Sequence, residues 1–416
     1  MKIIKSKYIH KNRMMERDNE TQKKVGLLGA IIDNGNMGCV ALTYSIIRAL
    51  EIISIRLECG FQYYIFENTY NLKKIDYLCD ELKISRNQIK WAPVGYLHKV
   101  SSRIKYMRKN REMKSKLREC DFVIDLTQGD SFTDIYGKER FLIHTKIKEL
   151  VEEMGIPIIL GPQTYGPFQN EKNRLYAKKI IQGSNMVISR DYASAAYLNS
   201  FCNKKIYVTT DLAFMLPFKK IERSSELGKI KVGVNVSSLL IKKKTEATIT
   251  DFTLKTDYDC YIKELMDYLS QKENYEIHLI PHVGYDAVIE TGTKYPKAIV
   301  HQKFETPIEA KNCIADMDIF IGSRMHATIA AFSSGVATIP VAYSRKFSGL
   351  YNNLGYPYVV DMQLLETQNA VQLTINYIKK FRELSDKGKD CISEVESKSK
   401  DTLRLLEKAI KQIGDR

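Results

Sequence analysis

Four basic residues lie close together within the segment FIGSRMHATIAAFSSGVATIPVAYSRK at residues 320–346. Arg324 and His326 occupy the turn between an apolar strand pattern and a run of small residues typical of a helix. Arg345 and Lys346 follow the next apolar run, and no Asp or Glu lies between Arg324 and Lys346. Arginine binds carboxylate or phosphate through parallel hydrogen bonds, lysine acts as a point charge, and histidine moves protons near neutral pH. The pattern predicts an anion site with acid–base chemistry.

The local geometry of this turn decides whether Arg324 and His326 can act together. We expect Ser323 to cap the helix and residues 324–326, which include Met325, to form its first turn. Unpaired backbone N–H groups and the helix dipole attract an anion there. Residues two apart on a regular helix point about 200° from each other, so the two side chains share a ligand only where the turn is irregular. The alternative is a surface arginine beside a buried, hydrogen-bonded histidine.

A similar arrangement occurs in VISRDYASAAYL at residues 187–198, where Arg190 and Asp191 separate an apolar strand pattern from a helix. Arg190 would then add a basic residue at the end of a third strand. The alternative is that Asp191 caps the helix and Arg190 lies on the surface.

Three loops rich in glycine, amide and hydroxyl groups also follow apolar strand patterns. They are DNGNMG (33–38), TQGDSFTDIYG (127–137) and GPQTYGPF (161–168). Glycine lets a ligand approach the backbone closely, but none of the loops has a dinucleotide or Walker phosphate pattern. Each loop alone could be an ordinary turn. Together they predict one wall of a binding cleft.

The elements that position these residues are short apolar runs that alternate with helical patterns. This alternation predicts parallel sheets covered by helices on both faces. We expect strands at residues 25–32, 63–67, 122–126, 157–161, 186–190, 206–210, 231–237, 275–281, 298–302, 318–322 and 337–343.

The chain has 416 residues, which is too many for one ordinary core. A charged stretch at 217–229 containing proline and glycine interrupts the pattern and is the expected linker. The predicted fold class is α/β, with two doubly wound Rossmann-like domains at 23–216 and 230–380 that face each other across a cleft. A polar helix is expected at 389–413. Ligands of such sheets bind beyond the carboxyl ends of the strands, where the basic residues and the loops fall.

The net charge of +15 favours anionic partners. Much of it lies in a basic tail at 1–22 and in the stretch 99–118, which would be solvated surfaces or, for 99–118, a contact with an anionic membrane. Eight scattered cysteines form no CxxC pair, and no apolar stretch follows the basic N-terminus. We therefore expect a cytoplasmic protein that could be peripheral at the inner face of the membrane.

In their order and spacing, the motifs GNMG, GDSF, GPQTYGPF, SRD, DLAFMLP, GSRMHA and YSRK resemble the polysaccharide pyruvyl transferase family over about residues 25–365. The resemblance implies a fold similar to the two-domain GT-B glycosyltransferases. It also implies transfer of pyruvate from phosphoenolpyruvate to saccharide hydroxyls, with formation of a ketal. The chain departs from the family at GNMGCVA, where Cys39 and Val40 stand in place of the acidic residues of many members.

The resemblance implies that Arg190, Arg324, Met325 and Lys346 bind phosphoenolpyruvate and that His326 is the catalytic acid or base. The acceptor would be a cell-surface polysaccharide, a glycan or a lipid-linked precursor. Acceptor contacts are expected from the strand-end loops, at Asn34, Asn36, Asp130, Gln163 and Tyr165. Side chains supply the cations, so neither a metal nor a cofactor is expected, and nucleic acid is not an expected partner.

Two alternatives remain open from the sequence. A nucleotide-sugar glycosyltransferase would share the scaffold, but the absence of a carboxylate from 324–346 counts against ribose binding there. A non-enzymatic protein that binds polyanions or membranes would explain the basic segments 1–24 and 99–118. It would leave the polar strand-end loops unexplained.

Overall fold

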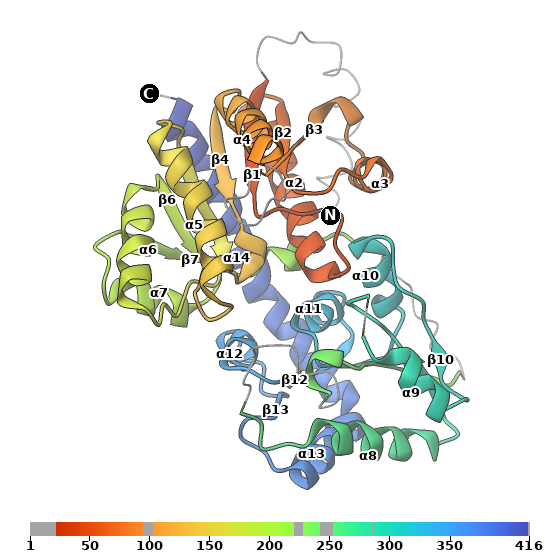
Figure 1. The fold of residues 1–416 in the computed structure, drawn as a ribbon. Coiled ribbons are helices and arrows are strands. Elements are labelled where there is room, and N and C mark those ends of the chain that lie inside the picture. Colours follow the sequence, from red (N-terminus) through yellow and green to blue (C-terminus); the bar gives the residue numbers. More distant parts are fainter. Residues whose placement is uncertain (1–21, 95–102, 220–227, 242–252, 285, 415–416) are drawn as a thin grey trace.

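The computed structural model describes residues 22–94, 103–219, 228–241, 253–284 and 286–414. Nearly all of the predicted tail, most of the predicted linker at 217–229 and the first residues of the basic stretch lie outside these ranges. Within them, the chain forms two parallel sheets with interleaved helices, as Figure 1 shows. The predicted α/β fold with two doubly wound, Rossmann-like halves is confirmed.

Over the described residues, the first sheet has seven strands in the order β3-β2-β1-β4-β5-β6-β7. Adjacent strands are parallel throughout. The strands are β1 (Lys23–Leu28), β2 (Phe61–Phe66), β3 (Ile89–Ala92), β4 (Phe122–Asp125), β5 (Ile158–Gln163), β6 (Met186–Ser189) and β7 (Ile206–Val208). Successive side chains of one strand enter different apolar clusters, as Leu27 and Leu28 do, because helices cover both faces.

The second sheet has six strands in the described part of the chain, in the order β10-β9-β8-β11-β12-β13. They are again parallel. The strands are β8 (Ile230–Asn235), β9 (Tyr275–Leu279), β10 (Ile299–Val300), β11 (Ile319–Gly322), β12 (Ala337–Ala342) and β13 (Val360–Asp361). The order of strands reverses beside the first strand of each sheet, which is where ligands of such folds bind.

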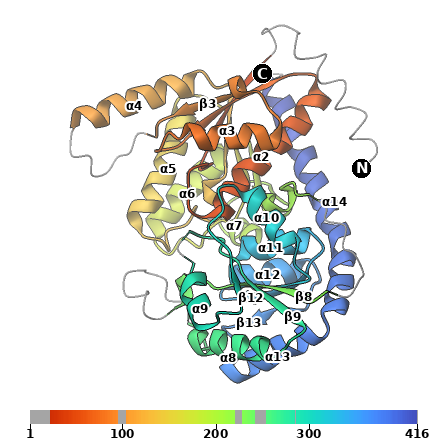
Figure 2. The ribbon, with the colours of Figure 1, turned by 90° about the vertical axis from the view of Figure 1, so that its right-hand side faces the viewer.

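Helices connect successive strands and pack on the two faces of each sheet (Figures 1 and 2). The helices of the first half are α2 (Met37–Leu57), α3 (Leu72–Leu82), α4 (Arg103–Arg118), α5 (Lys138–Glu153), α6 (Glu171–Gly183) and α7 (Tyr192–Asn199). Those of the second half are α8 (Tyr258–Ser270), α9 (Val288–Lys294), α10 (Pro307–Ala315), α11 (Met325–Ser333), α12 (Arg345–Asn353), α13 (Thr367–Lys379) and α14 (Phe381–Gly414).

The C-terminal helix differs from its prediction. It was expected at 389–413, but α14 begins at Phe381 and runs through Gly388. This glycine is buried within the helix, and a Cβ atom there would make an ordinary contact with the Phe332 ring at 3.8 Å. Toward its end α14 crosses to the first half of the chain, where Leu406 is buried in the same cluster as α2 and Glu407 pairs with Arg56 at 3.3 Å. Both views show α14 running along both halves.

Helix α2 has the length and apolar composition of a membrane span, and among the described helices it alone meets that test. Its most apolar window is 67% buried inside the protein. The helix packs against β2, α10, α11 and α14, so its apolar surface is covered by both halves of the chain. This is the burial expected of a core helix.

The carboxyl ends of the two sheets face each other through direct backbone contacts. The Met37 N–H donates to the His282 carbonyl at 3.0 Å, and the Gly284 N–H donates to the Gly35 carbonyl at 2.8 Å. Asn36 and Val283 form the antiparallel bridge between them. The glycine-rich loop after β1 is therefore joined to the loop after β9.

Candidate active site

The start of α11 differs from the predicted one. Arg324, not Ser323, is the N-cap residue, and its backbone is extended with φ −111° and ψ 120°. Ser323 is buried and its hydroxyl accepts a hydrogen bond from the Tyr258 hydroxyl at 2.9 Å, so it is not available to cap the helix. Because Arg324 precedes the regular helix, its side chain is not constrained to point away from that of His326. The separation of about 200° between residues two apart on a regular helix therefore does not apply to this pair.

His326 lies at the junction of the two domains. Its Nδ1 side faces Gly38 at the start of α2, where a Cβ atom would come within 2.4 Å of Nδ1. Its Nε2 atom is 3.8 Å from Asp211 Oδ2 and has no hydrogen-bond partner among the described residues. Burial lowers the pKa of His326, although Asp211 opposes this effect. The imidazole is therefore not on the surface, and its Nε2 atom makes no hydrogen bond within the described residues.

Arg190 is buried, with 5% of the residue exposed, so the alternative of a surface arginine is wrong. Its Nε donates to Thr164 Oγ1 at 2.8 Å and its Nη1 donates to Asp211 Oδ2 at 2.6 Å. Nη2 is buried without a partner among the described residues. Burial acts to lower the pKa of Arg190, but Asp211 and other carboxylates raise it above the ordinary arginine value. Asp191 does cap α7, as that alternative expected.

Arg324 is held by a carboxylate of the same domain. Its Nε and Nη2 donate to Asp286 Oδ1 at 3.0 and 2.7 Å. The other Asp286 oxygen accepts from the backbone N–H groups of His282 and Val283, both at 3.0 Å. The loop after β9 therefore fixes the guanidinium and, through His282, also contacts the start of α2.

Lys346, in the first turn of α12, reaches across to the first domain. Its ammonium forms an ion pair with Asp130 and donates to the Tyr136 hydroxyl at 3.2 Å. Burial opposes the charge on both partners, but the pairing lowers the pKa of Asp130 and raises that of Lys346. Both side chains are partly exposed, at 28% and 26% respectively, so the pair is accessible to a ligand. Arg140 lies beside it and donates to Ser131 Oγ at 2.6 Å.

The cations thus meet carboxylates that come from other parts of the sequence. Asp130, Asp211 and Asp286 pair with Lys346, Arg190 and Arg324. Residues 324–346 contain no carboxylate, but the folded site does contain carboxylates, which other segments of the chain supply. It no longer argues against a nucleotide sugar.

The predicted acceptor residues are not all brought to one surface. Gln163 is fully buried and donates to the carbonyl and the carboxylate of Asp125 at 3.1 and 3.0 Å. The Tyr165 hydroxyl is also internal and donates to the carbonyls of Gly161 and Ile188. Gln163 and Tyr165 therefore lie inside the first domain, where their side chains hold β4, β5 and β6 together.

The other three predicted acceptor residues lie nearer the cleft. Asn36 caps α2 through its side-chain oxygen, which accepts from the Gly38 N–H at 3.0 Å. Asp130 forms an ion pair with Lys346 and so lies beside the basic residues of the cleft. Asn34 is exposed and lines a cavity of about 200 Å³ beyond the ends of β1, β2 and β4.

That cavity has a polar lining which includes Glu67, Gln128 and His144. The Glu67 carboxylate accepts from the backbone N–H groups of Ile32 and Asp33, and burial raises its pKa to about 7. Gln128 has a left-handed backbone with φ 53°, and its side-chain oxygen accepts from Arg140 at 3.3 Å. Through Gln128 and Arg140 the cavity adjoins the Asp130–Lys346 pair.

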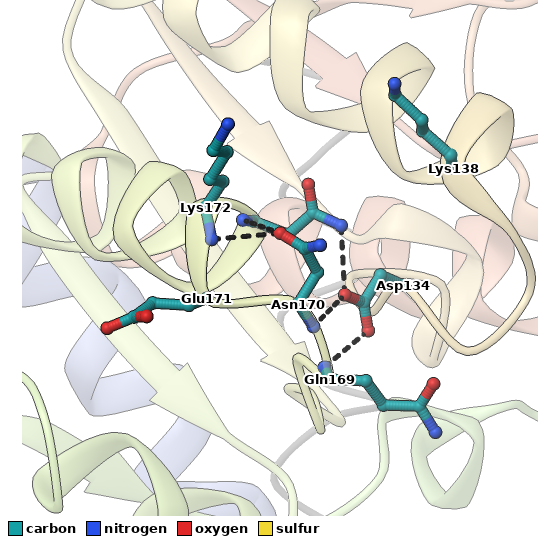
Figure 3. A pocket seen from close by; sticks show the side chains of 7 residues that line it. Asp134, Lys138, Gln169, Asn170, Glu171 and Lys172 are labelled. Carbon is teal, nitrogen blue, oxygen red and sulfur yellow. Dashed lines mark hydrogen bonds between the residues drawn. The ribbon is translucent and has the colours of Figure 1, made fainter.

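A larger open pocket of about 650 Å³ lies outside the cleft, where the loop after β4 meets the start of α6 (Figure 3). Its Asp134 accepts from the backbone N–H groups of Gln169 and Asn170 at 2.8 and 3.0 Å. The carboxylate is thereby occupied in fixing the loop after β5. None of the basic cleft residues lines this pocket, so it is not the candidate active site.

Sequence reasoning missed Asp211, Asp286, Glu67 and Arg140. Asp211 directly follows the expected strand at 206–210, at the same kind of position that identified Arg190 and Arg324, whereas Asp286 comes five residues after the expected strand at 275–281. In the described ranges, no group of three His, Cys, Asp or Glu residues is placed to hold a metal ion.

The fold is that of two-domain, GT-B-like α/β proteins. A putative UDP-N-acetylglucosamine 2-epimerase from Listeria monocytogenes superposes with a TM-score of 0.61 at 11% identity, covering 94% of this chain and 97% of that one. The UDP-GlcNAc 2-epimerase from Neisseria meningitidis gives 0.54 at 10% identity, covering 90% of this chain and 100% of that one. At such low identity the likeness shows the fold alone.

The chain belongs to the polysaccharide pyruvyl transferase family, whose model matches residues 59–345. This range includes Arg190, Arg324 and His326, and it ends one residue before Lys346. The amylovoran biosynthesis protein AmsJ from Erwinia amylovora is 20% identical over 295 residues, which are 66% of this chain and 69% of that protein. The protein is therefore an enzyme of this class with a polysaccharide-modifying role.

Proposed function

We propose that the protein transfers pyruvate from phosphoenolpyruvate to hydroxyl groups of a saccharide and forms a pyruvate ketal. The observation that carries this proposal is the pair of buried, unpartnered nitrogens at the domain junction, Arg190 Nη2 and His326 Nε2. Buried polar groups are nearly always hydrogen-bonded, and the presence of two such nitrogens beside the single Asp211 carboxylate supports a ligand site at this junction. A small ligand that carries a carboxylate and a phosphate close together suits this environment.

The donor would lie between the two domains. Arg190 and Arg324 offer guanidinium groups from opposite sheets, and Lys346 offers an ammonium at the first turn of α12. Met325 is the first residue of α11, and its backbone N–H would add a donor at the positive end of the helix. These groups would stabilise the charge that develops on departing phosphate.

The reaction needs proton transfer at the methylene carbon of the donor. The double-bond electrons form the new C–H bond with the added proton, which leaves a cation at the central carbon. An acceptor hydroxyl oxygen attacks that carbon and loses its proton to neutral His326. A second hydroxyl then attacks in place of the phosphate, which leaves with the bonding electron pair and takes up the second hydroxyl proton. His326 would act first as acid and then as base.

The acceptor sugar would occupy the cavity beside Asn34. Amide and carboxyl groups at Asn34, Glu67 and Gln128 suit sugar hydroxyls, which both donate and accept hydrogen bonds. Asn36 and Asp130 stay as proposed contacts at the border between the two substrates. We also propose that the protein works in the cytoplasm on a saccharide precursor that can be lipid-linked.

The test is to incubate the protein with phosphoenolpyruvate and candidate glycans and to seek added pyruvate by mass spectrometry and released phosphate by a colorimetric assay. His326→Ala and Arg324→Ala are each expected to lower turnover by at least about 100-fold, because each removes acid–base or electrostatic catalysis. His301→Ala is the matched control, since His301 packs against His278 outside the cleft.

Near-normal turnover in both His326→Ala and Arg324→Ala would contradict the assignment of these residues to the active site. Turnover of UDP-sugars by the wild type, with none of phosphoenolpyruvate, would replace the proposal with a nucleotide-sugar transferase.

A further inference from the structure

Asp211 lies where the chain leaves the first sheet, three residues after β7. Its Oδ1 accepts from the Ala213 N–H at 2.8 Å and so caps a short 3-10 helix, Leu212–Met215. The side chain is fully buried. Its Oδ2 accepts from Arg190 Nη1 at 2.6 Å and lies 3.8 Å from His326 Nε2. One carboxylate oxygen thus faces a cation of the first domain and the imidazole of the second.

We propose that Asp211 is a positioning residue that holds the Arg190 guanidinium toward the cleft and supports positive charge on the His326 imidazole. This role rests on the proposed function, in which His326 carries a proton to and from the substrates. Because Oδ2 takes only Nη1 of Arg190, the unpartnered Nη2 and His326 Nε2 remain available to the donor. Asp211 would therefore align both groups on one ligand.

The backbone around Asp211 supports this alignment. The Thr209 N–H donates to the Ser189 carbonyl at 2.9 Å and ties the segment to the strand that precedes Arg190. On the other side, Phe214 of the same short helix packs edge-on against Phe332 of α11 at 6.3 Å between ring centres. The carboxylate is therefore attached to the elements that carry both of its partners.

Charged and titratable groups of both domains face His326. They are Asp211, Arg190, Asp130, Lys346 and His282. Burial acts most strongly to lower the pKa of His326, and among the charges Asp211 has the largest influence, in the opposite direction. Removal of its charge leaves Asp130 as the next carboxylate that favours the imidazolium.

The test measures protonation of His326 without any substrate. Imidazole nitrogen shifts of ¹⁵N-histidine-labelled protein are followed against pH, with His326→Gln used to assign the resonance. Asp211→Asn is expected to lower the midpoint of His326 by about 1 pH unit or more, because an opposite charge within about 4–6 Å shifts a pKa by that amount. An unchanged or higher midpoint overturns the proposal, as does a wild-type His326 that stays neutral down to acid unfolding.

Asp125→Asn is the matched control, since Asp125 is another buried carboxylate in an ion pair, with Lys148 Nζ at 3.1 Å. An equal fall of the His326 midpoint in this control would overturn a specific role for Asp211. Should Asp211→Asn fail to fold, the wild-type protein labelled with ¹³C at aspartate Cγ decides instead. The chemical shift of Asp211 Cγ must then change at the pH where His326 titrates. A shift that does not follow the His326 titration overturns the proposal.

Turnover adds a second readout. Asp211→Asn is expected to lower kcat for phosphate release by about 100-fold or more, the usual contribution of a general acid or base, with a smaller change in KM. Asp211→Glu keeps the charge and should recover part of kcat. If the wild type releases no phosphate from phosphoenolpyruvate, the proposed function fails, whereas the nuclear magnetic resonance result still decides the role of Asp211.

Discussion

The His326 ring lies against the backbone of Gly38, and we predict from this contact that the glycine is needed for activity. A Cβ atom at this position would stand 2.4 Å from Nδ1, so the ring or the helix must move. Gly38→Ala is expected to lower kcat about 100-fold, because displacement of a catalytic group by about 1 Å can have that effect. Steady-state kinetics measures the loss, and circular dichroism checks that the fold survives.

Gly349→Ala is the control for this substitution. Gly349 lies in α12 with open space beside its Cα, so alanine should leave turnover unchanged and stabilise the helix slightly. Wild-type turnover in Gly38→Ala would contradict the placement of His326 against α2.

Glu67 predicts a pH dependence of stability. Burial raises its pKa from 4.5 to about 7. Between these two values the folded protein keeps a proton that the unfolded chain releases, so the free energy of unfolding falls as pH rises through this window. The shift corresponds to about 3 kcal/mol. Glu67→Gln should remove this component.

Urea unfolding at pH 5 and pH 8 measures the effect. The wild type should lose more stability than Glu67→Gln between the two pH values, and the difference between the two proteins isolates this carboxyl from all other titrations. Equal losses would show that Glu67 titrates near its ordinary pKa.

The basic residues of the cleft could be predicted from the sequence, because Arg190, Arg324 and His326 each lie where an apolar strand pattern gives way to a helix. Their partners could not, because pairing depends on which strands are neighbours across the domain junction. Asp211 meets His326 only once both sheets have formed. Gln163 also lies at a strand end, but its side chain turns inward to Asp125, which the sequence pattern does not indicate.

At the scale of elements, the eleven expected strands are all present, with ends that differ by a few residues. The strands β3 and β13 were missed. The sequence of β3, IKWA, contains an exposed Lys90, and β13 has only two residues, so neither gives a continuous apolar run. Edge strands need less burial than central ones, and both lie at the edge of their sheet.

Helix α4 is the described part of the basic stretch 99–118 and projects from the first domain (Figure 2). We predict that reversing the charge of the exposed Arg108, Arg111 and Lys114 lowers recovery of the protein with anionic vesicles, because each basic residue near such a surface contributes about 1 kcal/mol. Turnover on a soluble acceptor should not change. Equal recovery of both proteins in a sedimentation assay would remove the membrane role.

For the whole molecule, the candidate active site draws side chains from both sheets. The basic side chains come from both halves. One ion pair, between Lys346 of the second half and Asp130 of the first, joins them. The backbone contacts between the loops after β1 and β9 fix the facing edges. The two-domain, GT-B-like architecture was predictable from the alternation of strands and helices, whereas these contacts required the assembled sheets.

The path of α14 limits how this protein can be recombined with its relatives. The helix starts on the second domain and buries Leu406 and Ile410 in the cluster that contains α2 of the first. A chimera made by exchanging everything after the linker would replace part of the first domain's packing with a foreign helix. A chimera that combines the first domain of one relative with the second domain of another should therefore use two breakpoints. One would lie near 217–229 and the other before Phe381, so that each first domain keeps its own α14.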